Sequence, residues 1–292
     1  MPCFADGEAL ASKSSLRFSR AANNHRQHPV NYSSLLHTAR VDRDSVTLEL
    51  TPDWLQGRTA FGGWQAALAV RAMRQVIGED IPLRSLQANF IAPVLPGPVS
   101  ARAELLRQGK SAAQLEARIL IGDQVAFTAL GIFGAARASA IIERPLAPAC
   151  ALAPNDLKDL PYIEGVVPVF TKHFKMRWAS GGHPFSGAVN GDAQIYVRFC
   201  DEDLVSEAHL VNIADAIPPS AIAMLKTPVA ISSMNWTLEF VTPLDDAMRN
   251  GWLRFDASLT ASRDGYGWEN VSIWSEAGEL IALSRQCIAV FG

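Results

Sequence analysis

The strongest chemical signal in the sequence is one acidic residue within an otherwise apolar segment. Three side chains in residues 210–225 are polar: Asn212, Asp215 and Ser220. A carboxylate buried among apolar residues needs hydrogen-bond partners, and such a carboxylate can act as a general base. A second interpretation stays open, because Pro218 and Pro219 interrupt a helix and Asp215 could be the N-cap of a helix that restarts there.

Other short motifs lack the surroundings that their usual chemistry requires. The stretch Gly109-Lys110-Ser111 lacks the earlier glycine of a phosphate-binding loop, and a strand rather than a helix is expected after it. The glycines of 265–267 lie in an expected turn, not between a strand and a helix. The histidines show no spacing typical of metal ligands. We therefore expect no cofactor and no metal.

The composition is that of a globular protein without a polyanionic partner. Of the 292 residues, 49% are hydrophobic and 19% are charged, and the formal net charge is −3. This balance argues against nucleic-acid binding. The four cysteines are far apart in the sequence, which favours a reducing compartment, and no apolar run reaches the ~18 residues of a membrane span. We expect a soluble cytoplasmic protein.

The first half of the chain predicts one helix followed by several strands. Residues 62–77 begin at the glycine pair Gly62 and Gly63. Apolar residues then recur at helical spacing: Ala66, Ala69, Val70, Met73, Val76 and Ile77. Further apolar residues widen this surface, so we expect the helix to be surrounded by other elements. Strands are expected at 83–94, 99–106, 114–121 and 124–133.

The second half repeats the same order of elements. Its helical pattern consists of Leu210, Ile213, Ala214, Ile217, Ala221 and Met224, and strands are expected at 229–241, 252–260, 268–274 and 280–291. Residues 90–93 (Phe-Ile-Ala-Pro) correspond to 240–243 (Phe-Val-Thr-Pro), and 131–134 correspond to 289–292. Such self-similarity indicates a duplication. A helix followed by antiparallel strands predicts the α+β class.

The proline pattern divides the chain into parts. Four prolines at 145, 148, 154 and 161 oppose both helix and interior strand, so we predict a Pro/Ala-rich linker over residues 138–166. We expect a disordered N-terminal extension in residues 1–30, an N-terminal unit in 31–137 and a C-terminal unit in 167–292.

An ordered set of segments resembles the type II acyl-CoA thioesterases, whose fold is the double hotdog. Its parts are Phe61-Gly62-Gly63-Trp64-Gln65, the segment 85–97 that ends in Pro-Gly, Arg107-Gln108-Gly109-Lys110-Ser111, Ile195-Tyr196-Val197-Arg198, and Ser233-Met234-Asn235-Trp236. The resemblance covers about residues 34–136 and 190–292. It implies two repeats of a long central helix wrapped by a curved antiparallel sheet.

The resemblance also implies an activity and a set of site residues. That family hydrolyses acyl-CoA to free fatty acid and CoA by means of a water held by an aspartate, a serine or threonine, and a glutamine. By position these are Asp215, Ser233 and Gln286 of the C-terminal unit. Backbone N–H groups at Gly62 and Gly63 would bind the substrate carbonyl. Acyl-CoA would be the partner, and homo-oligomers of double-hotdog units would be compatible with this reading.

The residue pattern leaves other roles open for two of these residues. If side chains alternate strictly along residues 229–241, Ser233 shares the polar face with Asn235 and Thr237, and Ser232 would replace it after a shift of one residue. The side chain of Gln286 could instead form hydrogen bonds with the neighbouring backbone and have no part in a site.

Two other functions remain as alternatives. One is a non-catalytic acyl-CoA-binding hotdog protein, because the residues that follow Ser233 and Gln286 differ from the family pattern. The less favoured one is a hotdog enoyl-CoA hydratase, which pairs a carboxylate with a histidine. His209 precedes Asp215 by six positions, a spacing that does not bring two side chains together on a helix.

Overall fold

The computed structural model describes residues 30–150, 152–200 and 203–291. The expected extension in residues 1–30 thus lies outside the described residues, apart from Val30. The first half contains α1 (Tyr32–His37), β1 (Arg40–Val41), β2 (Ser45–Leu50), the 3₁₀ turn η1 (Pro52–Trp54), β3 (Leu55–Gln56), β4 (Thr59–Ala60), α2 (Gly62–Ile77), β5 (Leu83–Phe90), β6 (Gly97–Gln108), β7 (Ala112–Ile121) and β8 (Gln124–Gly134).

The second half begins with two 3₁₀ turns and continues with strands around a short helix. Its elements are η2 (Pro154–Asp156), η3 (Val169–His173), β9 (Phe174–Gly181), β10 (Ala193–Phe199), α3 (Glu207–Ala214), η4 (Ser220–Ala223), β11 (Ala230–Phe240), η5 (Asp246–Met248), β12 (Leu253–Arg263), β13 (Tyr266–Trp274) and β14 (Leu280–Phe291).

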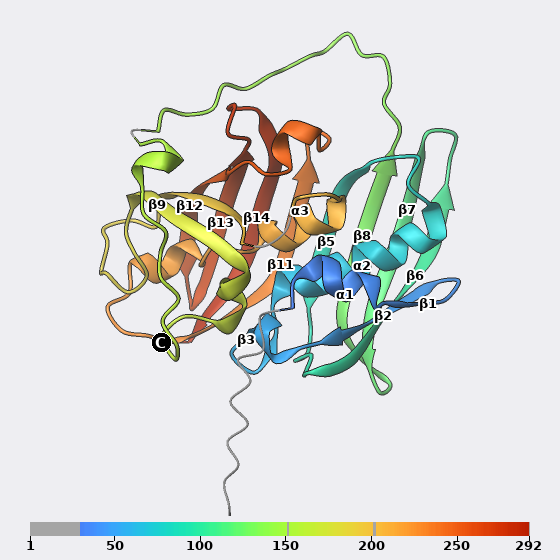
Figure 1. Cartoon of the computed structure of the whole chain (residues 1–292), viewed down its shortest axis with the longest axis horizontal. Helices are drawn as coiled ribbons and strands as arrows, with labels where there is room; N and C mark the ends of the chain where they lie inside the picture. Colours follow the sequence, from blue (N-terminus) through green and yellow to red (C-terminus); the bar gives the residue numbers. More distant parts are fainter. Residues whose placement is uncertain (1–29, 151, 201–202, 292) are drawn as a thin grey trace, which may run out of the picture.

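Strands of both halves form one antiparallel sheet (Figure 1). Its order is β1-β2-β6-β7-β8-β5-β11-β14-β13-β12-β10-β9. The order is mirrored about the central pair β5 and β11, because each neighbour of β5 has a counterpart beside β11. The two strands of that pair meet at Gln87 and Thr237. The α+β class with an antiparallel sheet is confirmed.

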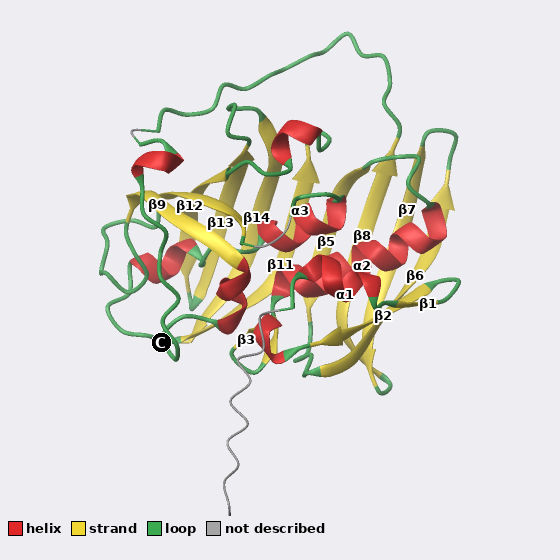
Figure 2. Ribbon diagram, viewed as in Figure 1, coloured by secondary structure: helices red, strands yellow, loops and turns green. Residues whose placement is uncertain are grey.

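The α-helices α1, α2 and α3 lie together on one side of the sheet (Figure 2), and α2 is the best buried of them. It begins and ends where the sequence predicts, at Gly62 and Ile77. It packs against β2, β6, β7 and β8 and against α3. Because neighbours cover it on several sides, α2 has a wide apolar surface rather than a narrow stripe. Its position directs its first turn towards the end of α3.

The second helix is much shorter than the sequence predicts. The helical spacing extends to Met224, but α3 ends at Ala214, and a separate 3₁₀ turn, η4, follows at Ser220–Ala223. The physical reason is the pair Pro218 and Pro219, since proline has no N–H for the helical ladder and disfavours helix in the preceding residue. The continuous helical pattern to Met224 was therefore wrong, whereas the interruption expected at Pro218 and Pro219 is confirmed.

The segment between β8 and η2 contains neither helix nor strand among its described residues. Figure 1 shows it passing from the end of β8 to the far strands of the second half. There its backbone carbonyls accept hydrogen bonds, from Arg254 to Pro148 and from Tyr196 to Leu152. Since one sheet includes strands of both halves, the division at 138–166 stays a prediction.

Candidate active site

The three side chains expected to share one site come together. Asp215 directly follows α3, Ser233 lies in β11, and Gln286 lies in β14. The Gln286 Nε2 group donates a hydrogen bond to Asp215 Oδ1 over 2.6 Å. The Ser233 hydroxyl donates to Gln286 Oε1 over 3.1 Å. The arrangement is a chain of hydroxyl, carboxamide and carboxylate, in which the carboxamide makes both contacts.

The first turn of α2 closes the site on the side opposite the sheet. The Gly63 backbone N–H donates a hydrogen bond to Asp215. A side chain at Gly62 would bring its Cβ to 2.6 Å from Asp215 Oδ2, and one at Gly63 would collide with the backbone oxygen of Asn212. Both glycines therefore allow the end of α3 to approach α2. The positive end of the α2 dipole also favours a negative charge at this point.

A β-bulge in β11 turns Ser233 towards the site. The pairing of β11 with β14 is regular except at Met234, where the register shifts between Ser233 and Asn235. Without the bulge, Ser233 would share the outer face with Asn235; with it, Met234 is 42% exposed and Ser233 meets the buried Gln286. The strict alternation expected from the sequence is therefore wrong at Ser233. Ser232 is exposed and contacts only the backbone oxygen of Ser233 among the bonds described.

The carboxyl group of Asp215 has a strongly perturbed acidity. Burial raises its pKa from 3.8 to about 7, while the hydrogen bonds from Gln286 and the Gly63 N–H oppose this rise and the nearby Glu269 adds to it. A carboxylate with a pKa near neutrality is well matched to proton transfer at neutral pH.

The alternative role of Asp215 as an N-cap is wrong. Asp215 is the C-cap of α3, and the N-cap of η4 is Pro219. Its side chain points to partners on β14 and α2 instead of satisfying the N–H groups of a following helix.

The mirrored half of the sheet lacks the polar side chains of this site. The pairing of β5 with β8 has the same bulge between Leu83 and Ser85, so Leu83 stands where Ser233 stands in β11. Gly131 pairs with Leu86 as Gln286 pairs with Trp236. The hydroxyl and the carboxamide thus belong to the second half. By the same pairing, Gly131 is the equivalent of Gln286 in the other half, not of Ala289. The correspondence of 131–134 with 289–292 was therefore wrong by three residues.

His209 is held at the other end of α3. Its ring lies 2.8 Å from the Ser206 hydroxyl and 2.9 Å from the Ser33 hydroxyl. Asp215 follows it by six positions, which corresponds to about 9 Å along a helix. The described residues include no group of three or more His, Cys, Asp or Glu side chains that could hold a metal ion.

Glu269 on β13 is an acidic residue beside this site that was not predicted from the sequence. It lies directly opposite Gln286 in the pairing of β13 with β14 and is only 5% exposed. The alternating pattern of this strand could have identified it, because Glu269 shares the buried face with Gly267, Val271 and Ile273.

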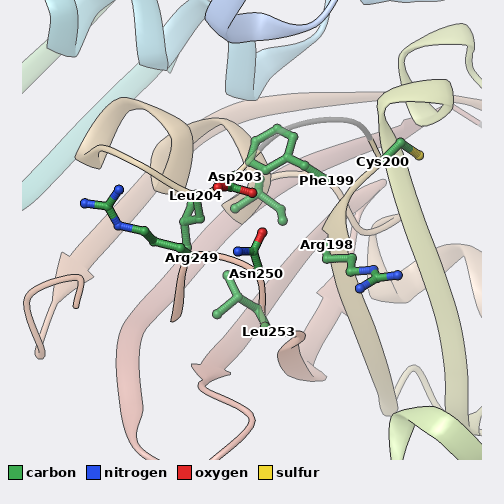
Figure 3. A pocket seen from close by; sticks show the side chains of 10 residues that line it. Arg198, Phe199, Cys200, Asp203, Leu204, Arg249, Asn250 and Leu253 are labelled. Atoms are coloured by element: carbon green, nitrogen blue, oxygen red, sulfur yellow. The ribbon is translucent and has the colours of Figure 1, made fainter. Parts of the chain in front are cut away.

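Two cavities lie near the central helices. One of about 240 Å³ is lined by residues of β10, α3 and β12 and of the loops that precede α3 and β12. Figure 3 shows Arg198 and Arg249 on opposite sides of it, with Asn250 between them. The other, of about 420 Å³, lies beside Arg74, Glu207 and Phe240. Neither of these two cavities is lined by Asp215, Ser233 or Gln286.

Comparison with solved structures shows that the protein has a hotdog fold. A hotdog-fold protein of unknown function from Alicyclobacillus acidocaldarius has a TM-score of 0.79 and 20% identity, over 87% of this chain and 96% of that one. An acyl-CoA thioesterase II from Mycobacterium marinum has a TM-score of 0.68 and 17% identity, over 86% and 94%. At such identities the likeness shows the fold.

Sequence comparison with family models identifies the family. Residues 50–134 match the acyl-CoA thioesterase N-terminal domain, and residues 154–290 match the acyl-CoA thioesterase C-terminal domain. The chain belongs to the acyl-CoA thioesterase family, which supports a thioesterase function. None of the curated proteins compared with the chain matches it significantly in sequence. No helix among the described residues is long and apolar enough to cross a membrane.

Proposed function

We propose that the protein hydrolyses the thioester of acyl-CoA to a free fatty acid and CoA, with Asp215, Ser233 and Gln286 as the catalytic residues. The observation that carries the proposal is the continuous hydrogen-bonded chain from Ser233 through Gln286 to Asp215. These residues are 18 to 71 positions apart in the sequence, and a purely structural role would not require a hydroxyl, a carboxamide and a carboxylate to meet.

The reaction needs one water molecule and no covalent intermediate. The water oxygen attacks the thioester carbonyl carbon while Asp215 accepts its proton. The carbon–sulfur bond then breaks, and the proton passes to the departing CoA sulfur. Ser233 and Gln286 can each donate and accept hydrogen bonds, so they orient the water beside the carboxylate.

The first turn of α2 is the proposed site for the carbonyl oxygen. The first N–H groups of a helix have no acceptor within the helix and carry partial positive charge. Because the Gly63 N–H already donates to Asp215, the N–H of Gly62 is the better placed donor for the oxyanion. Gly63 then contributes by holding the base rather than the substrate.

The mirrored strand order supports a double hotdog with one catalytic half. In this proposal the second half supplies the catalytic side chains and the first half supplies the helix start at Gly62. A cytoplasmic location, acyl-CoA as the partner and assembly into homo-oligomers belong to the same proposal. The sparse cysteines and the family support it.

Replacement of Asp215 tests the proposal. We expect Asp215→Ala to lower turnover of acyl-CoA by about 10²-fold or more, because it removes the general base. The measurement is thiol release from acyl-CoAs of graded chain length, with circular dichroism as a check of folding. The matched control is Asp123→Ala, which removes an exposed carboxylate in the β7–β8 turn.

Two results would contradict the assignment. Turnover close to wild type in Asp215→Ala on every substrate that the wild type hydrolyses would remove Asp215 from the mechanism. Binding of acyl-CoA by the wild type without any thiol release would favour the non-catalytic alternative.

A further inference from the structure

Glu269 is a buried carboxyl group that the proposed reaction does not use. It is flanked on its sheet by Leu259 of β12 and Gln286 of β14. Among the residues that the structure describes, it forms no ion pair with an arginine, lysine or histidine. Burial raises its pKa. A buried carboxyl group without a cation is costly, so its presence beside the site calls for a reason.

The contact of Glu269 is with the segment that carries Asp215. Its Oε2 accepts a hydrogen bond from the Ser220 backbone N–H over 2.6 Å. Since Pro218 and Pro219 have no N–H, Ser220 offers the first backbone donor after Ile217. Glu269 therefore ties the far end of this segment to β13, while Gln286 ties Asp215 itself to the adjacent strand β14.

The Glu269 carboxyl group also lies beside the partner of the base, because Glu269 is directly opposite Gln286 in the pairing of β13 with β14. Burial and the Glu269 carboxyl group both act to raise the pKa of Asp215, against the hydrogen bonds from Gln286 and Gly63. From α2 the group facing Asp215 is the Gly63 N–H, from β14 it is the neutral Gln286, and from β13 it is Glu269. Glu269 is thus the neighbouring acidic group that a single substitution can remove.

We propose that Glu269 is a positioning residue of this site, which anchors the turn after Asp215 and holds a second carboxyl group beside Gln286, the partner of Asp215. The inference rests on the proposed function, because it assigns Glu269 a part in the same hydrolysis. Glu269 is expected to have two separate effects, one through its hydrogen bond and one through its charge. The tether sets where Asp215 lies, and the charge sets the pH at which Asp215 accepts a proton.

Two variants distinguish these effects. Glu269→Gln keeps an oxygen that can accept from the Ser220 N–H but removes the charge, so we expect the acid limb of the kcat/KM profile to move to lower pH by about half a unit or more. Glu269→Ala also removes the tether, and we expect kcat to fall about tenfold or more with little change in KM. The matched control is Glu239→Gln, an exposed glutamate on β11.

A second measurement does not depend on activity. NMR titration of ¹³C-labelled aspartate carboxyl groups, with Asp215 assigned through Asp215→Asn, should show a lower midpoint for Asp215 in Glu269→Gln than in wild type and in Glu239→Gln. An unchanged midpoint together with an unchanged pH profile would overturn the proposal. If the wild type releases no thiol, the proposed function fails, while the titration still decides whether Glu269 acts on Asp215.

Discussion

At the scale of single residues, Asp215 is subject to opposing influences. Burial and Glu269 disfavour its charged form, whereas Gln286, the Gly63 N–H and the start of α2 favour it. The result is a pKa of about 7, compared with an ordinary value of 3.8. The unfolded chain therefore ionises this group at a lower pH than the folded protein does. Between these two values the folded state binds more protons, so its stability falls as the pH rises.

We therefore expect Asp215→Asn to be more stable than wild type at high pH. The amide cannot ionise, so the variant escapes the cost of a buried charge. We expect equal or lower stability near pH 4 and a gain of about 1 kcal/mol or more at pH 8. Urea unfolding at both pH values measures the difference. A parallel pH dependence in the two proteins would show that Asp215 is not buried as described.

At the scale of elements, the contact between α2 and α3 depends on glycine. Gly62 and Gly63 are the first residues of α2 and pack against the last turn of α3. Besides its clash with Asn212, a Cβ atom on Gly63 would lie 2.7 Å from the Phe61 ring. The backbone of Asn212 cannot move away without displacing Asp215, three residues later. Close packing of two helix ends thus controls the position of the base.

We therefore expect Gly63→Ala to destabilise the fold by about 1–3 kcal/mol, the usual cost of overpacking. Gly62→Ala should chiefly reduce turnover, because its Cβ would displace the Asp215 carboxyl group. The control is Gly109→Ala in the β6–β7 turn, where a Cβ meets its nearest neighbour at an ordinary 3.5 Å. Chemical denaturation and thiol release measure the two effects. Equal behaviour of all three variants would contradict the packing argument.

At the scale of the whole molecule, aromatic and charged contacts join the two halves beside the sheet. Trp54 of η1 stacks on His173 of η3 with ring centroids 3.7 Å apart. Asp53 Oδ2 lies 3.2 Å from His173 Nε2 and accepts a hydrogen bond from the Val30 N–H. Although burial acts to raise the pKa of Asp53, the interactions with His173, Thr51 and the Val30 N–H outweigh it and lower the pKa to about 2. A second link is the ion pair of Arg74 with Glu207.

The sign of this shift predicts an effect opposite to that of Asp215. A carboxyl group with a lowered pKa stabilises the folded state above pH 3.8, and the contribution is lost as the pH falls towards 2. We expect Asp53→Asn to lose about 1–2 kcal/mol at pH 6, with a smaller loss at pH 3. Urea unfolding at both pH values, with Asp123→Asn as control, measures it. A loss that does not depend on pH would contradict this account.

Local patterns were sufficient for much of the fold. The period of apolar residues predicted α2 from Gly62 to Ile77 and the strands β6, β7, β8 and β14 to within a few residues, because each pattern reflects one buried face. It also identified Asp215 as unusual, since a carboxylate in an apolar segment is visible without any tertiary information. The pairing of Asp215 with Ser233 and Gln286 came from the family resemblance.

Only the tertiary structure decided how these residues meet. The bulge at Met234 reverses the orientation that alternation assigns to Ser233, and bulges depend on pairing with a partner strand rather than on the strand's own sequence. The approach of Gly63 to Asn212 and the burial of Glu269 likewise depend on segments distant in the chain. The sequence alone determined α2, several strands of each half and the unusual character of Asp215, because these depend on local patterns. Long-range packing decided their mutual distances and hence the acidity of Asp215.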